Sequence, residues 1–180
     1  MQITVSRNET KHLIEKLETS AEASMLSIAN LAAENDPMSF LYECKFHENG
    51  FDPLDCTRSL NFVEQLHQTF TCLASFKGAE YIFAKHSNVK YLTLNLGASK
   101  GFDIEGSEGD TVTAEVFASV NPDNNSKLLK DIFRVATAKT KFKYVFFMAT
   151  YHPFYEKTFE HKGVVVNVVS LGIEKGKFLK

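Results

Sequence analysis

Two carboxylates stand at positions where an unpaired charge is costly. Asp103 begins a short predicted strand inside the run GFDIEG, and Glu115 lies in the middle of the apolar stretch TVTAEVFASV. Taking an unpaired carboxylate out of water costs several kcal/mol or forces the group to be neutral. A turn bounded by glycine separates the two predicted strands, so we expect the carboxylates to converge. Oxygen ligands of this kind suit a divalent cation such as Mg²⁺ or Mn²⁺.

The elements that must position these carboxylates follow from hydrophobic periodicity. Helical spacing or helix-start residues predict three helices, over 8–35, 59–86 (with a possible interruption at Gly78) and 127–139. Alternation or apolar runs predict five strands, over 90–97, 102–106, 111–120, 144–150 and 164–170. We expect residues 38–47 to form a short strand or an irregular arm, and a helical connection to join the last two strands.

This order of elements predicts an α/β (α+β) fold with a mixed central sheet flanked by helices. The length of 180 residues fits a single domain with a substantial core. Within residues 1–180 we expect a helical extension over 1–58, a core over about 60–150 and a C-terminal strand region over 151–180.

The two acids and the order helix, three strands, helix, strand resemble the PD-(D/E)xK nuclease superfamily, which includes restriction endonucleases. The resemblance implies a restriction-endonuclease-like αβββαβ core with Asp103 and Glu115 as catalytic metal ligands. It also implies a further acid on the first core helix, for which Glu80 is the candidate and Glu64 the alternative. Members of this superfamily commonly act as homodimers, because one site cuts one strand and a two-fold pair cuts both.

The lysine of the motif is missing from its usual position. It is expected two residues after Glu115, where this chain has Phe117. A cation is needed there to orient or deprotonate the attacking water and to stabilise developing charge. We predict that Lys127, at the start of the next helix, takes this role. Lys100 and Lys130 are the alternatives.

Charge is distributed unevenly along the chain. Residues 1–122 carry 9 basic and 17 acidic side chains, whereas residues 123–180 carry 11 basic and 5 acidic ones. The densest basic cluster consists of Lys139, Lys141 and Lys143. A positive segment of this kind attracts a polyanion. We therefore expect 123–180 to provide much of the contact with DNA, and a solvated lysine surface is the alternative.

Several classes of protein are disfavoured. No run of 18 or more apolar residues is present, so no membrane span is expected. The N-terminal residues do not show the pattern of a secretion signal. Three cysteines without CxxC spacing indicate reduced thiols in a cytoplasmic protein. Glycine patterns for phosphate or dinucleotide binding are missing, so no small-molecule cofactor is expected.

The sequence therefore predicts a metal-dependent endonuclease that hydrolyses phosphodiester bonds of DNA. Two alternatives remain open. Because Phe117 replaces the motif lysine, the chain can be a non-catalytic nucleic-acid-binding or accessory subunit on the same fold. The acidic N-terminal half can also belong to a protein-interaction module, such as an immunity or antitoxin-like factor that presents a DNA-mimicking surface.

Overall fold

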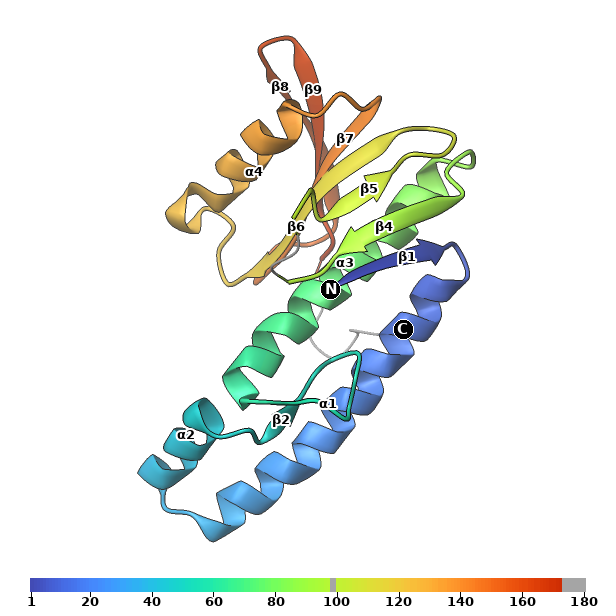
Figure 1. Ribbon diagram of the computed structural model, residues 1–180. Helices are drawn as coiled ribbons and strands as arrows, with labels where there is room; N and C mark the ends of the chain where they lie inside the picture. The colour runs from blue at the N-terminus through green and yellow to red at the C-terminus, as the bar shows by residue number, and fades with distance from the viewer. Residues whose placement is uncertain (98–99, 173–180) are drawn as a thin grey trace. The chain divides into compact units, whose positions relative to one another are not determined.

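The computed structural model describes residues 1–97 and 100–172, which form two compact units. One unit contains the sheet and comprises residues 1–10 and the described chain from residue 74 onward. The other is mainly helical and comprises residues 11–73. The boundaries between the units fall within two long helices, α1 (Glu9–Glu34) and α3 (Phe62–Lys85), both labelled in Figure 1.

Within the described residues, the sheet has seven strands in the order β1-β4-β5-β6-β7-β9-β8. Their bounds are Gln2–Ser6 (β1), Tyr91–Asn95 (β4), Ile104–Gly106 (β5), Val112–Ser119 (β6), Phe142–Ala149 (β7), Tyr155–His161 (β8) and Val164–Ser170 (β9). The first four strands in this order pair antiparallel. Strands β6, β7 and β9 pair parallel, and β8 closes the edge antiparallel to β9.

A helix on each face gives the sheet unit three layers. Helix α4 (Lys127–Ala136) connects β6 to β7, as a parallel pair requires. Alternate residues of β7 point to opposite faces. Val145 and Phe147 belong to the buried cluster that also contains Ile132 of α4. On the other face, Phe146 packs edge-on against Tyr81 of α3, with ring centroids 5.5 Å apart.

Gly78 allows the close approach of α3 to this face. A Cβ at Gly78 would lie 3.0 Å from the Phe146 ring and 3.3 Å from Ile104, so a larger side chain would push the helix off the sheet. The helix continues through Gly78 without a break, and the interruption predicted there was wrong. The glycine serves packing between layers, not a bend.

The helical unit contains α2 (Pro37–Phe46) and the two-residue strands β2 (Gly50–Phe51) and β3 (Ser59–Leu60), which pair antiparallel. Asp36 caps α2 by accepting hydrogen bonds from the backbone N–H groups of Met38 and Ser39. A buried hydrogen bond of 2.6 Å joins Ser24 on α1 to Gln65 on α3. Gln65 also accepts a bond from the backbone of Phe51, which ties the short hairpin to the helices.

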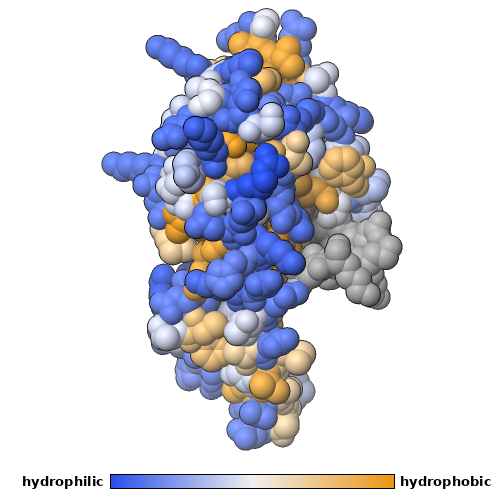
Figure 2. Space-filling model, turned by 90° about the vertical axis from the view of Figure 1, so that its right-hand side faces the viewer, coloured by the Kyte–Doolittle hydropathy of each residue, from blue (hydrophilic) through white to orange (hydrophobic). Residues whose placement is uncertain are grey.

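The surface of the protein carries both polar and apolar side chains. On the face shown in Figure 2, hydrophilic side chains predominate and hydrophobic ones form scattered patches. Four large apolar side chains of α2 are more than half exposed and lie at i, i+3, i+4 and i+8, so they share one side of the helix: Met38, Leu41, Tyr42 and Phe46. Among the described helices, none is both long and apolar enough to cross a membrane.

The predicted mixed sheet with flanking helices is confirmed at the level of fold class. The three predicted helices correspond to α1, α3 and α4, and the five predicted strands to β4, β5, β6, β7 and β9. Besides the interruption at Gly78, two predictions were wrong. Residues 38–47 are largely helical, because Asp36 caps a helix that starts at Pro37. The connection before β9 is the edge strand β8, not a helix. Strand β1 was not predicted at all.

Candidate functional site

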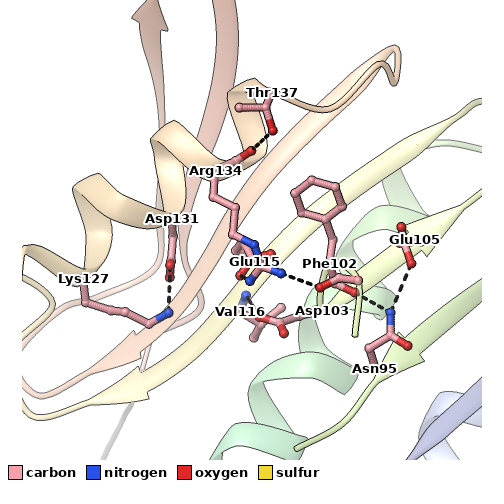
Figure 3. A network of polar contacts seen from close by, with 11 residues as sticks. Asn95, Phe102, Asp103, Glu105, Glu115, Val116, Lys127, Asp131, Arg134 and Thr137 are labelled. Carbon is pink, nitrogen blue, oxygen red and sulfur yellow. Dashed lines mark hydrogen bonds and ion pairs between the residues drawn. The ribbon is translucent and has the colours of Figure 1, made fainter. Parts of the chain in front are cut away.

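The turn between β5 and β6 brings Asp103 and Glu115 to neighbouring positions. The register pairs Ile104 with Ala114, so Asp103, one residue earlier, comes opposite Glu115, one residue later (Figure 3). Side chains at opposed positions of an antiparallel pair have Cβ atoms about 4.5–5.5 Å apart. Ile104 points toward α3, so both acids lie on the face covered by α4.

Glu115 is one of the most buried charged residues of the chain, with 1% of its surface exposed. Burial, followed by the nearby charge of Asp103, raises the pKa of Glu115 to about 8. A glutamic acid with this pKa is largely protonated at neutral pH when no further cation is present. Desolvation therefore makes this carboxyl a strong acceptor for added positive charge.

Asp103 is fixed by the strand that carries its partner. Its Oδ2 accepts a hydrogen bond of 2.7 Å from the backbone N–H of Val116. Burial raises the pKa of Asp103, whereas the bond from Val116 and the charges of Lys127 and Arg134 act in the opposite direction. The backbone bond holds one oxygen in place and leaves the carboxylate directed at the space next to Glu115 (Figure 3).

Helix α4 supplies a third carboxylate and a lysine. Asp131 is 4% exposed. Its Oδ1 forms an ion pair of 2.7 Å with the Nζ of Lys127, which lies one turn earlier on the helix. The same Nζ lies 5.6 Å from the centroid of the Phe117 ring. Burial raises the pKa of Asp131, and Lys127 counteracts this. The ammonium group of Lys127 therefore reaches the side chain that replaces the motif lysine.

The second cation of the site is Arg134. Its Nη1 donates to Glu115 Oε2 at 2.7 Å, and its Nη2 donates to the carbonyl of Gly101 at 2.5 Å. The guanidinium carbon lies 5.3 Å from the centroid of the Phe102 ring. Gly101 has φ +107°, and a Cβ there would lie 3.0 Å from both Asn95 and Glu105, so only glycine suits this turn.

Two buried carboxylate oxygens of this cluster lack a hydrogen-bond partner among the described residues, namely Oε1 of Glu115 and Oδ2 of Asp131. An orphaned buried oxygen is costly unless a proton or a cation satisfies it. Facing carboxylates with free oxygens fit a hard divalent cation, which takes oxygen ligands and keeps several waters. Within residues 1–97 and 100–172, no three His, Cys, Asp or Glu side chains are already arranged around one metal position.

Other predicted candidates have different contacts. Glu80 on α3 pairs with Lys77 at 3.0 Å, and Glu64 accepts a bond from Gln68. This ion pair holds Glu80 on its own helix, and Asp131 is the third acid beside the pair. Both alternative lysines, Lys100 and Lys130, are exposed.

Sequence reasoning missed Asp131 and Arg134. A signal for Asp131 was present, because it shares the helical spacing of the apolar residues Leu128, Ile132 and Val135, which pack toward the core. An acid on the inward side of an amphipathic helix needs a partner. Arg134 gave no such signal, since its position is compatible with an exposed side.

Comparison of the chain with protein-family models, with curated proteins and with solved structures found no match. The fold and the site define the class only as a mixed α+β protein with a buried carboxylate cluster between a sheet and a crossover helix. A more specific function rests on the chemistry of this cluster.

Proposed function

We propose that the chain is a metal-dependent nuclease that hydrolyses phosphodiester bonds of DNA at the Asp103–Glu115 pair. One observation carries the proposal: Lys127 reaches the Phe117 ring beside the two facing acids. A lysine that is absent from the strand is thereby supplied from the helix that follows. Carboxylates and a lysine on one side of a reacting phosphate are the groups that this hydrolysis needs.

The order of elements around the site supports the same proposal. Helix α3 precedes the antiparallel strands β4, β5 and β6, and α4 then leads to β7, which pairs parallel with β6. This is the αβββαβ order that the resemblance to PD-(D/E)xK nucleases implies. Glu115 lies on the third strand of this series, and Asp103 directly precedes the second.

The residues have separate roles in this chemistry. Asp103 and Glu115 would hold Mg²⁺ or Mn²⁺, which supplies positive charge against the phosphate and favours hydroxide formation when it is bound. Lys127, as an ammonium group, orients the attacking water and stabilises charge that develops on the phosphate oxygens. Asp131 keeps the Nζ of Lys127 in position through the 2.7 Å ion pair. The cation would also satisfy the orphaned Oε1 of Glu115.

The decisive experiment is cleavage of plasmid DNA by the purified chain with Mg²⁺ or Mn²⁺. We expect nicking or linearisation that needs the metal and is lost in Asp103→Ala and in Glu115→Ala. Loss of Mn²⁺ binding in the same variants, measured by calorimetry, separates a ligand role from a general defect. Binding of Mn²⁺ by the double variant with wild-type affinity would remove the proposed site.

One observation favours the binding-only alternative. Arg134 already donates to Glu115 at 2.7 Å and lowers its pKa, so the cluster has an internal cation without any metal. A non-catalytic DNA-binding or accessory subunit would keep this pair permanently. Metal-independent DNA binding, combined with no cleavage of any DNA by the wild type, would support this alternative.

DNA contact is proposed mainly for the basic C-terminal part of the chain. Lys157 and Lys162, on β8 and at the turn after it, belong to the described part of this segment and are exposed. The predicted cluster is partly engaged elsewhere, since Lys141 pairs with Asp110 at 2.8 Å and Lys143 donates to the carbonyl of Thr140. The stretch from residue 173 lies outside the described residues.

A homodimer is part of the proposal, and the exposed apolar side of α2 supports self-association. An apolar stripe on one helix can pack against its own copy around a two-fold axis. The same stripe would also suit the protein-interaction alternative, in which a different protein covers it. Light scattering of the Tyr42→Glu variant tests the dimer by measuring its mass in solution. Tyr42 is 54% exposed, and a charge on this apolar side of α2 should yield monomers.

A further inference from the structure

We infer that Arg134 is a phosphate-binding residue that is held on Glu115 until a divalent cation displaces it. The inference rests on the proposed function, because it assigns a second task to the same site. Arg134 makes two bonds there, to Glu115 Oε2 at 2.7 Å and to the carbonyl of Gly101 at 2.5 Å. Glu115 and Gly101 belong to the strand and to the turn that carry the acid pair.

Arg134 and a bound divalent cation would both contact the carboxyl group of Glu115. Glu115 is 1% exposed, and its Oε2 faces the guanidinium while its Oε1 has no partner among the described residues. A divalent ion bound to Glu115 would replace its carboxyl proton and neutralise the carboxylate that Arg134 contacts. The two positive groups would then lie close together in a poorly solvated space and repel each other. Binding of the ion therefore weakens the Arg134–Glu115 pair.

The side chain of Arg134 is able to leave without unfolding the helix. About half of it is exposed (51%), and its backbone belongs to the last turn of α4. Its guanidinium lies against the Phe102 ring, 5.3 Å from the centroid. This contact keeps the guanidinium near the acid pair after its bond to Glu115 breaks. Figure 3 shows the chain of contacts from Thr137 through Arg134 to Glu115.

The chemistry of the released group defines its ligand. A guanidinium binds the oxygens of a phosphate in a bidentate manner, which suits it better than a single ammonium for holding a phosphodiester. Lys127 stays on Asp131 and serves the water, whereas Arg134 would hold the phosphate. The cation and DNA then bind in order, because the first ligand prepares the residue that contacts the second.

Calorimetry with MnCl₂ on the full chain tests the competition without any DNA. We expect Arg134→Gln to bind Mn²⁺ about tenfold more tightly than the wild type, since a charge-assisted bond no longer opposes the ion. The matched control is Arg58→Gln, which removes an exposed arginine paired with Asp52 at 3.3 Å in the helical unit and should leave the affinity unchanged. Equal or weaker Mn²⁺ binding by Arg134→Gln, with normal binding by the wild type, overturns this inference alone. No Mn²⁺ binding by either protein removes the proposed metal site as well.

A second measurement follows the arginine itself, so the inference stays testable if Arg134→Gln folds poorly. In the wild type, the side-chain N–H signal of Arg134, assigned with Arg134→Lys, should move on addition of MgCl₂, and that of Arg58 should not. In the Lys127→Ala background, where a DNA duplex should stay intact, Mg²⁺ should raise DNA affinity about tenfold with Arg134 present. An Arg134 signal that ignores saturating Mg²⁺ would show that the arginine is not displaced, and would overturn the inference.

Discussion

Replacing Glu115 by Gln should remove a pH dependence of stability that the buried carboxyl creates. In the folded chain its pKa is about 8, against an ordinary value of 4.5. Between these values the folded protein holds a proton that the unfolded chain has released. The free energy of unfolding therefore falls as pH rises from about 4.5 to 8. The protonated Glu115 stabilises the folded chain in full only below about pH 4.5.

The expected size follows from this difference in pKa. Linkage sets a slope of at most about 1.36 kcal/mol per pH unit, so the loss from pH 5 to pH 8 is at most about 4 kcal/mol. Glutamine resembles the protonated acid and still accepts a hydrogen bond from Arg134. We expect Glu115→Gln to match the wild type near pH 5 and to be more stable by about 2–4 kcal/mol at pH 8.

Urea denaturation in EDTA, followed by circular dichroism across this pH range, measures the difference. Glu160→Gln is the matched control, because Glu160 is an exposed strand residue on β8. Excess Mg²⁺ should then stabilise the wild type selectively at pH 8, since it binds the ionised carboxylate of the folded state. Parallel stability curves for wild type and Glu115→Gln from pH 5 to pH 8 would refute the assignment of a raised pKa to this residue.

Three further predictions concern other parts of the chain. Lys127→Ala should lower the cleavage rate by about 10²–10³ while Mn²⁺ binding persists, and the control Lys130→Ala, an exposed lysine on the same helix, should cleave normally. Full activity of Lys127→Ala would move the role to Lys100 or Lys130. DNA affinity should fall with salt by a slope of about −0.9 per neutralised phosphate, and an affinity independent of salt would count against DNA as the partner. Tyr151 is 96% exposed with φ +62°, so Tyr151→Gly should raise the free energy of unfolding by about 0.5–1 kcal/mol in urea titrations; a destabilised variant would show that the side chain has packing that outweighs the backbone strain.

Local patterns were sufficient for most of the elements. Helical spacing and alternation depend on neighbours within a few residues, and they located α1, α3, α4 and the central strands. The pairing of Asp103 with Glu115 was also a local matter, because only a short turn separates the two strands. The residue types at these positions already implied that an acid would be buried.

The errors arose where one pattern has two interpretations. The run Asn35-Asp36-Pro37 ends α1, as the predicted helix over 8–35 implies. An Asp N-cap followed by Pro at the first helical position also starts a helix, and this second meaning produced α2. Strand β8 has a weakly apolar sequence because its side chains are exposed or half-buried at the edge of the described sheet.

Long-range contacts account for what the sequence could not show. Strand β1 becomes part of the sheet only by pairing with β4, about ninety residues later in the chain, as in Gln2 opposite Asn95. Arg134 reaches Glu115 because α4 packs over β6 in the folded chain, and no spacing along the sequence encodes that contact. The sequence thus indicated which two acids form the pair, whereas the cations beside them depend on how α4 packs on the sheet. Burial under that helix, which raises the pKa of Glu115, is likewise a property of the folded chain alone.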